Sequence, residues 1–134
     1  MKAAALYATL ALNVWVLGAM LVFALYSYPA FERSVATYAQ FNRTIAFAVV
    51  PFELLAFLVP LVLYATRPQP LWAVHALTAL GVSYFIITFA WHLPQHRPLA
   101  AGVAGNTGVL VASQWARTAV QVARVAVAGY LMRP

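Results

Sequence analysis

Cysteine is absent from this chain of 134 residues, and charged side chains are scarce. Without a thiol the chain has no disulfide, no thiolate metal ligand and no cysteine nucleophile. Charged residues make up 7% of the sequence and hydrophobic residues 65%, whereas a soluble domain carries roughly 25% charged residues. A small soluble domain leaves about a third of its unfolded surface in water and cannot hide so much apolar surface. The composition therefore predicts a single-domain integral membrane protein over residues 1–134, in contact with the lipid bilayer.

Acidic residues are the rarest charged type. Glu32 and Glu53 are the only two, against eight basic side chains, and this imbalance produces the net charge of +6. The basic residues are spread along the chain and form no stripe that could follow a phosphate backbone. We therefore expect no nucleic-acid partner.

Four stretches are long and apolar enough to cross a membrane, which takes about 20 residues. They run over residues 3–28, 44–65, 71–93 and 109–132. The turn at residues 67–70 is short, so the helices on either side of it are antiparallel neighbours. The sequence thus predicts an all-α integral membrane protein, a four-transmembrane-helix antiparallel bundle.

Prolines mark the ends and the interior of these helices. Pro51 and Pro60 lie inside the second helix, where we expect kinks, since neighbouring helices can satisfy the carbonyls that proline leaves unbonded. The halves of the chain also resemble each other weakly, because Tyr28-Pro29 closes the first helix as Leu93-Pro94 closes the third. Duplication of a helix pair and chance both explain this similarity.

A stripe of polar residues runs along the fourth helix. Gln114, Arg117, Gln121 and Arg124 follow one another at intervals of three, four and three residues, which places them on one helix face. Ionisable groups inside a membrane span are costly unless paired and mark functional sites by default. The stripe is therefore predicted to face the bundle interior or a partner chain.

Glu53 is the acid available to pair with these arginines. At about 1.5 Å per residue, Glu53 lies roughly 15 Å below Arg43, while Arg117 and Arg124 lie roughly 12 and 22 Å from the same side. We predict a Glu53–Arg117 or Glu53–Arg124 ion pair, and expect Arg43 to converge on the same interior face. One carboxylate does not offset two buried guanidinium groups, which favours a water-filled cavity or an electron-rich ligand. A structural staple between helices is the alternative.

Two histidines stand at the exit of the third helix. His92 and His96 are four residues apart, a spacing that suits one metal ion. However, Pro94 lies between them and no third ligand is obvious, so we predict no metal. A proton-transfer or ligand-orienting role fits better, because imidazole titrates near neutral pH; contact with lipid headgroups is the alternative. His75 lies near the opposite interface and is interpreted as structural.

Aromatic residues lie mainly where interfacial belts place them. Tyr28 and Trp91 also fall near the mouth of the expected pocket, where either would wall a flat hydrophobic ligand. Both roles remain open for these two residues.

Several short motifs are distributed along the predicted helices and the segments that join them. They are Tyr28-Pro29-Ala30-Phe31, Tyr38 with Asn42-Arg43-Thr44, Pro51-Phe52-Glu53-Leu54-Leu55, Leu93-Pro94-Gln95-His96-Arg97-Pro98-Leu99-Ala100, and Gln114-Trp115-Ala116-Arg117-Thr118 with Arg124. Together they resemble a group of small bacterial four-helix membrane proteins, the anthrone oxygenase-like family, most of which have no assigned function. The resemblance spans about residues 28–130 and implies a four-helix bundle in a bacterial inner membrane.

The resemblance also implies a chemistry. The named oxygenases of the wider group oxidise polycyclic anthrones to quinones without metal or flavin, so no cofactor is expected. By that analogy His96 is the base, Arg117 and Gln114 hold the developing phenolate, and Trp91 or Tyr28 stacks on the rings. The sequence departs from the family pattern at two positions, since Gln114 replaces an asparagine and His92 stands where glutamine is more familiar. Analogy of fold alone does not transfer function.

The sequence thus favours a membrane-embedded enzyme with an intramembrane polar pocket for a small lipophilic substrate, aromatic or terpenoid-like. The predicted catalytic residues are His96, Glu53 and Arg117, and the predicted substrate-binding residues are Tyr28, Asn42, Arg43, Trp91, His92, Gln114, Gln121 and Arg124. Alternatives that remain open are an isomerase or cyclase with Glu53 as acid, a small proton-coupled transporter, and a non-catalytic membrane subunit. The balance of basic residues favours cytoplasmic termini if Arg43 and Arg117 are internal, and a homodimer is compatible with the polar helix face.

Overall fold

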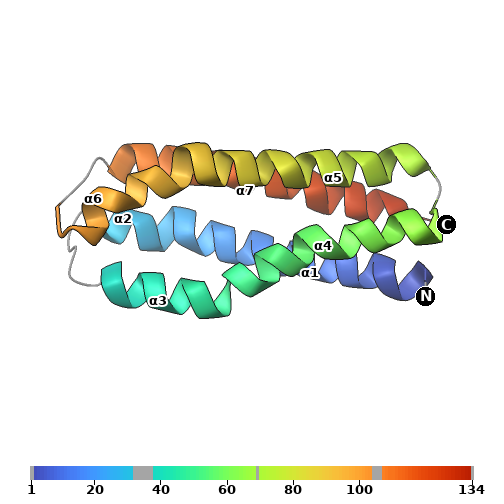
Figure 1. Ribbon diagram of the computed structural model, residues 1–134, viewed down its shortest axis with the longest axis horizontal. Helices are drawn as coiled ribbons and strands as arrows, with labels where there is room; N and C mark the ends of the chain where they lie inside the picture. Colours follow the sequence, from blue (N-terminus) through green and yellow to red (C-terminus); the bar gives the residue numbers. More distant parts are fainter. Residues whose placement is uncertain (1, 32–37, 69, 104–106, 134) are drawn as a thin grey trace.

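The chain folds into a bundle of long antiparallel helices, and its two termini lie at the same end of the bundle. The structure, a computed structural model, describes residues 2–31, 38–68, 70–103 and 107–133, and every regular element in these ranges is a helix. Figure 1 shows the long helices lying side by side, with the N- and C-termini at the same end of the bundle. We call this the terminal end and the opposite one the distal end. The prediction of an all-α fold is confirmed.

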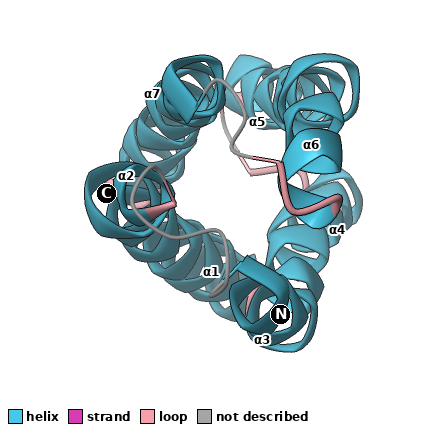
Figure 2. Cartoon of the chain, turned by 90° about the vertical axis from the view of Figure 1, so that its left-hand side faces the viewer, coloured by secondary structure: helices cyan, strands magenta, loops and turns pink. Residues whose placement is uncertain are grey.

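The helices form a closed ring around a common axis (Figure 2). Helix α1 (Lys2–Val22) packs against α4 (Val50–Thr66) and α7 (Thr107–Leu131), and α5 (Leu71–Ile86) packs against α7 and α4. Each long helix therefore contacts its neighbours in sequence, and α7 closes the ring against α1. The predicted antiparallel contact between the second and third helices is confirmed.

The first and third stretches both change register just before a proline. Residues Phe23–Ser27 and Ile87–His92 are π-helical. The backbone N–H of Tyr28 donates to the carbonyl of Phe23, and that of Leu93 to the carbonyl of Thr88, each five residues back. The following proline lacks an N–H and crowds the preceding turn, and a wider turn accommodates it. The weak similarity between the two halves thus has a structural counterpart.

The third stretch continues beyond its predicted end at residue 93. A 3₁₀ turn over Leu93–Gln95 leads into α6 (His96–Ala100), while the first stretch ends with the short α2 (Tyr28–Ala30). Pro94 stands near the start of the 3₁₀ turn, where its missing N–H costs little. His92 and His96 are therefore carried on one continuous helical stretch.

The second stretch is broken at its middle. Helix α3 (Tyr38–Ala48) begins six residues before the predicted start at 44, and Val49 separates it from α4. Pro51 lies in the first turn of α4, so the kink expected there is confirmed, whereas α4 continues through Pro60. In Figure 1, α3 and α4 follow different directions across the bundle.

Three of the four stretches, Lys2–Ala30, Gln40–Thr66 and Leu71–Ala100, are long and apolar enough to cross a membrane. The fourth, α7, has 25 residues and carries the polar stripe. Large apolar side chains such as Trp15, Phe47 and Ile86 are exposed on the outside of the bundle, as expected of a surface that faces lipid.

Apolar side chains fill the two ends of the bundle separately. The distal cluster includes Met20, Phe23, Tyr28, Tyr84 and Leu110. The terminal cluster consists of Leu63, Ala73, Val74, Leu77, Ala128 and Leu131. The polar stripe of α7 lies between the ends, where it meets side chains of α1, α4 and α5.

Candidate functional site

All four polar residues of the α7 stripe are buried inside the bundle. Gln114 and Gln121 are fully buried, and Arg117 and Arg124 expose only 4% and 1% of their surface. Their spacing keeps them on the face that α7 turns towards α1, α4 and α5. The prediction that the stripe faces the interior is confirmed.

Arg117 forms the predicted ion pair with Glu53. Its Nη2 donates to Glu53 Oε1 at 3.0 Å, and its Nη1 donates to Gln114 Oε1 at 3.1 Å. Gln114 in turn donates from Nε2 to the carbonyl oxygen of Met20 at 3.1 Å. The ion pair therefore joins α7 to α4, while the glutamine joins the arginine to α1.

Tyr84 completes this layer from α5. Its hydroxyl donates to Glu53 Oε1 at 2.7 Å and accepts a hydrogen bond from Arg117 Nη2. The Arg117 guanidinium also lies over the Tyr84 ring, 4.7 Å from its centre, which adds a cation–π contact. Sequence reasoning missed this residue, since a tyrosine within an apolar run has the pattern of an ordinary core residue.

Arg124 repeats the same arrangement seven residues further along α7. Its Nη1 donates to Gln121 Oε1 at 3.2 Å, and Gln121 Nε2 donates to both the carbonyl and the side-chain oxygen of Asn13, each at 2.9 Å. Asn13 stands seven residues before Met20, so a one-heptad shift along antiparallel α1 and α7 relates the two layers. We call them the Arg117 layer and the Arg124 layer.

The Arg124 layer contains no acid. Arg124 Nη2 donates instead to the carbonyl oxygen of Ala56. Pro60 stands four residues after Ala56 and has no N–H to offer this carbonyl. Arg124 therefore supplies the hydrogen bond that the proline removes from α4, the way neighbouring helices make prolines tolerable in membrane helices.

His92 and His96 are in direct contact at the distal end. Their Nε2 atoms lie 3.1 Å apart, and the Tyr28 hydroxyl lies 3.0 Å from His92 Nε2. Outward of this pair, the Tyr38 hydroxyl lies 2.7 Å from His96 Nδ1. Inward, His92 Nδ1 lies 2.9 Å from the Ser113 hydroxyl. A continuous chain of hydrogen bonds thus crosses the distal end.

The hydrogen bonds favour one arrangement of the ring protons. Ser113 lies 2.8 Å from the carbonyl of Leu110, to which it can donate its hydroxyl proton, and we therefore assign the ring proton of His92 to Nδ1, as donor to Ser113. In the neutral ring His92 Nε2 then carries the lone pair and accepts from His96 Nε2. Burial raises the pKa of Tyr38, so its hydroxyl keeps its proton and donates to His96 Nδ1.

His92 Nε2 consequently faces two donors, the Tyr28 hydroxyl and the His96 N–H. One lone pair accepts one donor in line. The second donor is therefore available to another acceptor, and a molecule in the adjoining cavity can provide one.

A cavity of about 140 Å³ lies between the histidines and the Arg117 layer. It is lined by Phe23, Tyr28, Asn42, Ile45, Val50, Glu53, Thr88, His92, Leu93, His96 and Arg117. All four helical stretches contribute to it. Among the described residues, the buried Nε atoms of both Arg117 and Arg124 have no hydrogen-bond partner.

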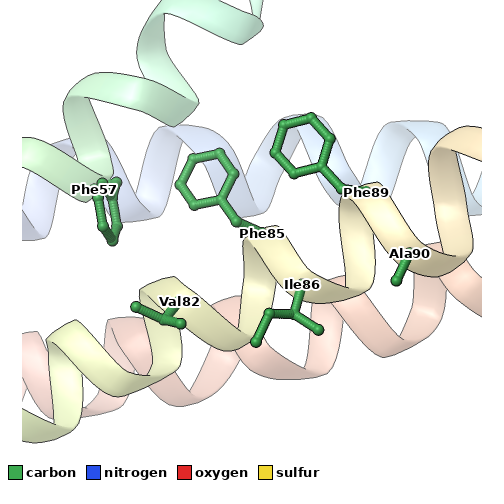
Figure 3. A pocket seen from close by; sticks show the side chains of 6 residues that line it. All are labelled: Phe57, Val82, Phe85, Ile86, Phe89 and Ala90. Carbon is green, nitrogen blue, oxygen red and sulfur yellow. The ribbon is translucent and has the colours of Figure 1, made fainter.

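One further hollow adjoins the cavity, and a groove adjoins that hollow. The hollow, of about 240 Å³, shares Asn42, Leu93 and His96 with the cavity and is also lined by Phe89. The groove is an open apolar one of about 410 Å³ between α4 and the third stretch, and Phe89 lines it as well (Figure 3). Shared residues thus connect the lining of the cavity to the apolar face of the bundle.

The structure brings together six of the predicted site residues. Those that line the cavity are Tyr28, Asn42, Glu53, His92, His96 and Arg117. Gln114 lies behind Arg117, whereas Gln121 and Arg124 form the second layer and are not among the residues that line the cavity. The sequence had given no signal that would separate the two layers.

Two predicted site residues lie on the outside. Arg43 is exposed on α3, so the expectation that it converges on the interior face is wrong. The estimate from residue spacing gives the depth of Arg43 along the helix axis, but not the side of the helix on which its side chain lies. Trp91 is 41% exposed and also lies outside the cavity lining.

His75, interpreted from the sequence as structural, is exposed near the terminal end. Its Nδ1 lies 3.0 Å from the Tyr64 hydroxyl, within hydrogen-bonding distance.

The donor set of the site is poor in metal ligands. Within the described ranges, no group of three or more His, Asp or Glu side chains is placed to hold a metal ion. His92 and His96 instead turn their nitrogens towards each other and towards hydroxyl groups. Searches against protein-family models, curated proteins and solved structures find no match to this chain, so its function must be argued from the site.

Proposed function

We propose that this chain is a four-span membrane enzyme that removes a proton from a small lipophilic aromatic substrate. The supporting observation is a cavity with a base on one wall and a cation on the other. The His92–His96 pair lines one side, and Arg117, held by Glu53, lines the other. A general base beside a preorganised cation is suited to forming an oxyanion.

The length and the faces of α7 support the proposal of four spans. Its 25 residues reach roughly 37 Å, enough to cross the hydrocarbon core. Its two arginines are turned inward, while Trp115, Val122 and Tyr130 are exposed on its outer face. The shared position of the termini in Figure 1 agrees with an even number of crossings.

His92 Nε2 is the atom best placed to take the proton. It carries the lone pair in the assigned tautomer, and His96 donates to it. The sequence analogy had named His96 as the base; the hydrogen bonds favour His96 as the residue that orients His92. To pass its proton to this nitrogen, a substrate hydroxyl in the cavity would have to take the place of both donors that now face it, the Tyr28 hydroxyl and the His96 N–H.

Arg117 is the group that stabilises the resulting anion. Its two terminal nitrogens are occupied by Gln114, Glu53 and Tyr84, whereas its Nε has no partner among the described residues. The fixed contacts hold the guanidinium in place, so the cation needs no reorganisation when charge develops in the cavity.

Glu53 is better explained as the counterion of Arg117 than as the acid of an isomerase or cyclase. Its Oε1 accepts hydrogen bonds from both Arg117 and Tyr84. In both contacts the carboxylate is the acceptor, so neither contact places Glu53 as a proton donor. The same contacts disfavour Glu53 as the exchangeable site of a proton-coupled carrier.

Oxygenation is the reaction that the family resemblance suggests for the anion. Removing a proton from an anthrone leaves an electron-rich anion that dioxygen can oxidise directly. One anthrone and one O₂ give one anthraquinone and one water. A single-ring hydroquinone reacts by the same logic, giving the quinone and hydrogen peroxide. Neither reaction requires a group that the chain does not supply.

The test uses purified protein in detergent with two probes, anthrone and trimethylhydroquinone, under air. Oxygen uptake and quinone formation above the rate in empty micelles are expected with at least one probe. The His92→Ala change is expected to lower that rate by about 10²- to 10⁴-fold, and His96→Ala by less, since it removes only the orienting group. His75→Ala is the matched control and should leave the rate unchanged.

Two outcomes would contradict the proposal. If neither probe is consumed above background by folded protein, the chain is not an enzyme of this kind. If His92→Ala folds and retains the full rate, the histidine is not the base. A rate that depends on His96 but not on His92 would reverse the assignment within the pair.

A further inference from the structure

The size of the polar cavity limits what it can hold. At about 140 Å³ it is close to the roughly 150 Å³ cavity that accommodates benzene in another protein, and smaller than the roughly 300 Å³ or more typical of sites for larger ligands. It therefore holds one six-membered ring with its oxygen atoms. A three-ring anthrone would have to leave most of its surface outside.

The apolar groove offers a different kind of space. Its walls are Phe57 from α4 and Val82, Phe85, Ile86, Phe89 and Ala90 from the third stretch. Figure 3 shows Phe85 and Phe89 side by side on the third stretch, with Phe57 facing them. These rings are in contact, with Phe57 and Phe85 centroids 5.1 Å apart and Phe85 and Phe89 rings stacked at 6.1 Å. The groove is wholly apolar and open on the outer face.

Shared lining residues link the groove to the cavity through the hollow that lies between them. Phe89 borders both the groove and the intermediate hollow, and Leu93 and His96 border both the hollow and the cavity. The break at Val49 directs α3 away from the line of α4 (Figure 1), next to this hollow. A molecule could therefore have one end among the polar groups and the other on the lipid-facing surface.

We propose that the substrate is a single-ring phenol or quinol that carries an apolar chain. The ring occupies the cavity between His92 and Arg117, and the chain leaves through the hollow and lies in the groove lined by Phe89. This inference rests on the proposed function and specifies its substrate class. It differs from the polycyclic substrate that the family resemblance implies.

The groove positions the chain more than it adds affinity. Moving an alkyl chain from lipid acyl chains into an apolar protein groove gives little hydrophobic free energy. The chain prefers the groove only through closer van der Waals packing. The expected gain is about five- to tenfold, the equivalent of roughly one good packing contact. The restriction on ring size is the stronger effect.

A second apolar groove provides a matched control. It has about 470 Å³ and is lined by Val14, Trp15, Gly18, Ala19 and Val22 on α1. It shares no lining residue with the polar cavity. Ala90 and Gly18 are both exposed on the outer face of the bundle, and a Cβ at Gly18 would meet nothing within 4 Å. Phenylalanine at either position fills one groove and leaves the other open.

The experiment measures binding under argon, separately from turnover, by equilibrium dialysis in detergent micelles. The probes are trimethylhydroquinone, a decyl-substituted hydroquinone and anthrone. We expect both hydroquinones to bind, the decyl compound about five- to tenfold more tightly after correction for empty micelles, and anthrone at least tenfold more weakly. Ala90→Phe should remove the advantage of the decyl chain, whereas Gly18→Phe should preserve it.

The outcomes separate this inference from the proposed function. Anthrone that binds and is oxidised in preference to both hydroquinones would overturn the single-ring substrate and leave the proton-removing enzyme intact. A decyl advantage that survives Ala90→Phe would overturn the groove. Hydroquinones that bind as predicted but are never oxidised would support the ligand class and contradict the enzyme.

Discussion

The two arginine layers of α7 have the same donors and opposite surroundings. In each, the arginine bonds a glutamine one turn earlier, and the glutamine bonds the backbone of α1. In the Arg117 layer the other end of the guanidinium meets Glu53 and Tyr84 beside a cavity. In the Arg124 layer it meets a backbone carbonyl. One helix thus carries, on a single heptad-spaced stripe, an arginine beside a cavity and an arginine bonded to the backbone of α4.

The difference follows from the helices that face α7. At the Arg117 layer, α4 presents the only acid of the predicted spans, and π-helical turns widen the first and third stretches nearby. Wider turns of this kind frequently occur at functional sites. At the Arg124 layer, α4 presents the carbonyl freed by Pro60, and α5 presents Gly81 with Phe57 close against it. Space is left open at the first layer and filled at the second.

The largest expected effect comes from removing the acid of the Arg117 layer. Glu53→Gln leaves a buried arginine without its counterion, which costs about 3–5 kcal/mol of stability. The measurement is unfolding in mixed micelles with increasing SDS, together with the oxidation rate. Most of the stability should return in the double variant Glu53→Gln with Arg117→Met, because the uncompensated charge is then gone, but activity should not return.

An equally large loss in both single and double variants would contradict this account. It would mean that the loss comes from the hydrogen bonds of Glu53 and Arg117 rather than from an uncompensated charge.

Much of the fold and part of this comparison could be predicted from the sequence. Long apolar runs and their separating prolines gave four helices and an antiparallel order. The intervals between Gln114, Arg117, Gln121 and Arg124 gave the buried stripe, since a helix repeats its faces regularly. The scarcity of acids gave the Glu53–Arg117 contact, because a buried arginine with one acid available has few ways to be paired.

The rest depended on information that the sequence pattern does not hold. Tyr84 and Ser113 look like ordinary members of apolar runs until their neighbours in space are known. The rotation of Arg43 out of the interior depends on where α3 begins and on the break at Val49. The continuation of helix past Pro94 depends on a local change to π and 3₁₀ turns, which spacing arguments based on regular helices do not predict.

A smaller effect tests whether the Arg124 layer is structural. Arg124→Met leaves the carbonyl of Ala56 and the side-chain oxygen of Gln121 without a donor, at a cost of about 2 kcal/mol. In a Pro60→Ala background the cost should fall by about 1 kcal/mol, because alanine at that position supplies the missing N–H to Ala56. A double-mutant cycle of unfolding in SDS measures this coupling.

The Arg124→Met variant also tests whether Arg124 takes part in binding the substrate. Oxidation rates of folded Arg124→Met should stay close to those of the unchanged chain, since Arg124 does not line the cavity. A folded variant that loses activity would instead return Arg124 and Gln121 to the substrate-binding set that the sequence suggested.

The smallest expected effect concerns Gly81, which links the Arg124 layer to the apolar groove. A Cβ at this position would lie 2.7 Å from Cδ2 of Phe57 and 3.8 Å from Nη2 of Arg124. Gly81→Ala should therefore cost about 1 kcal/mol, since overpacking outweighs the better helix propensity of alanine. Gly18→Ala, where a Cβ meets nothing within 4 Å, should be neutral or stabilising by up to about 1 kcal/mol.

Because the Phe57 ring has to move and also lines the groove, Gly81→Ala should weaken binding of the decyl hydroquinone while leaving trimethylhydroquinone unaffected. Equal stability changes at the two glycines would show that Phe57 yields freely, and the close packing of the Arg124 layer would then not distinguish it from the open layer at Arg117.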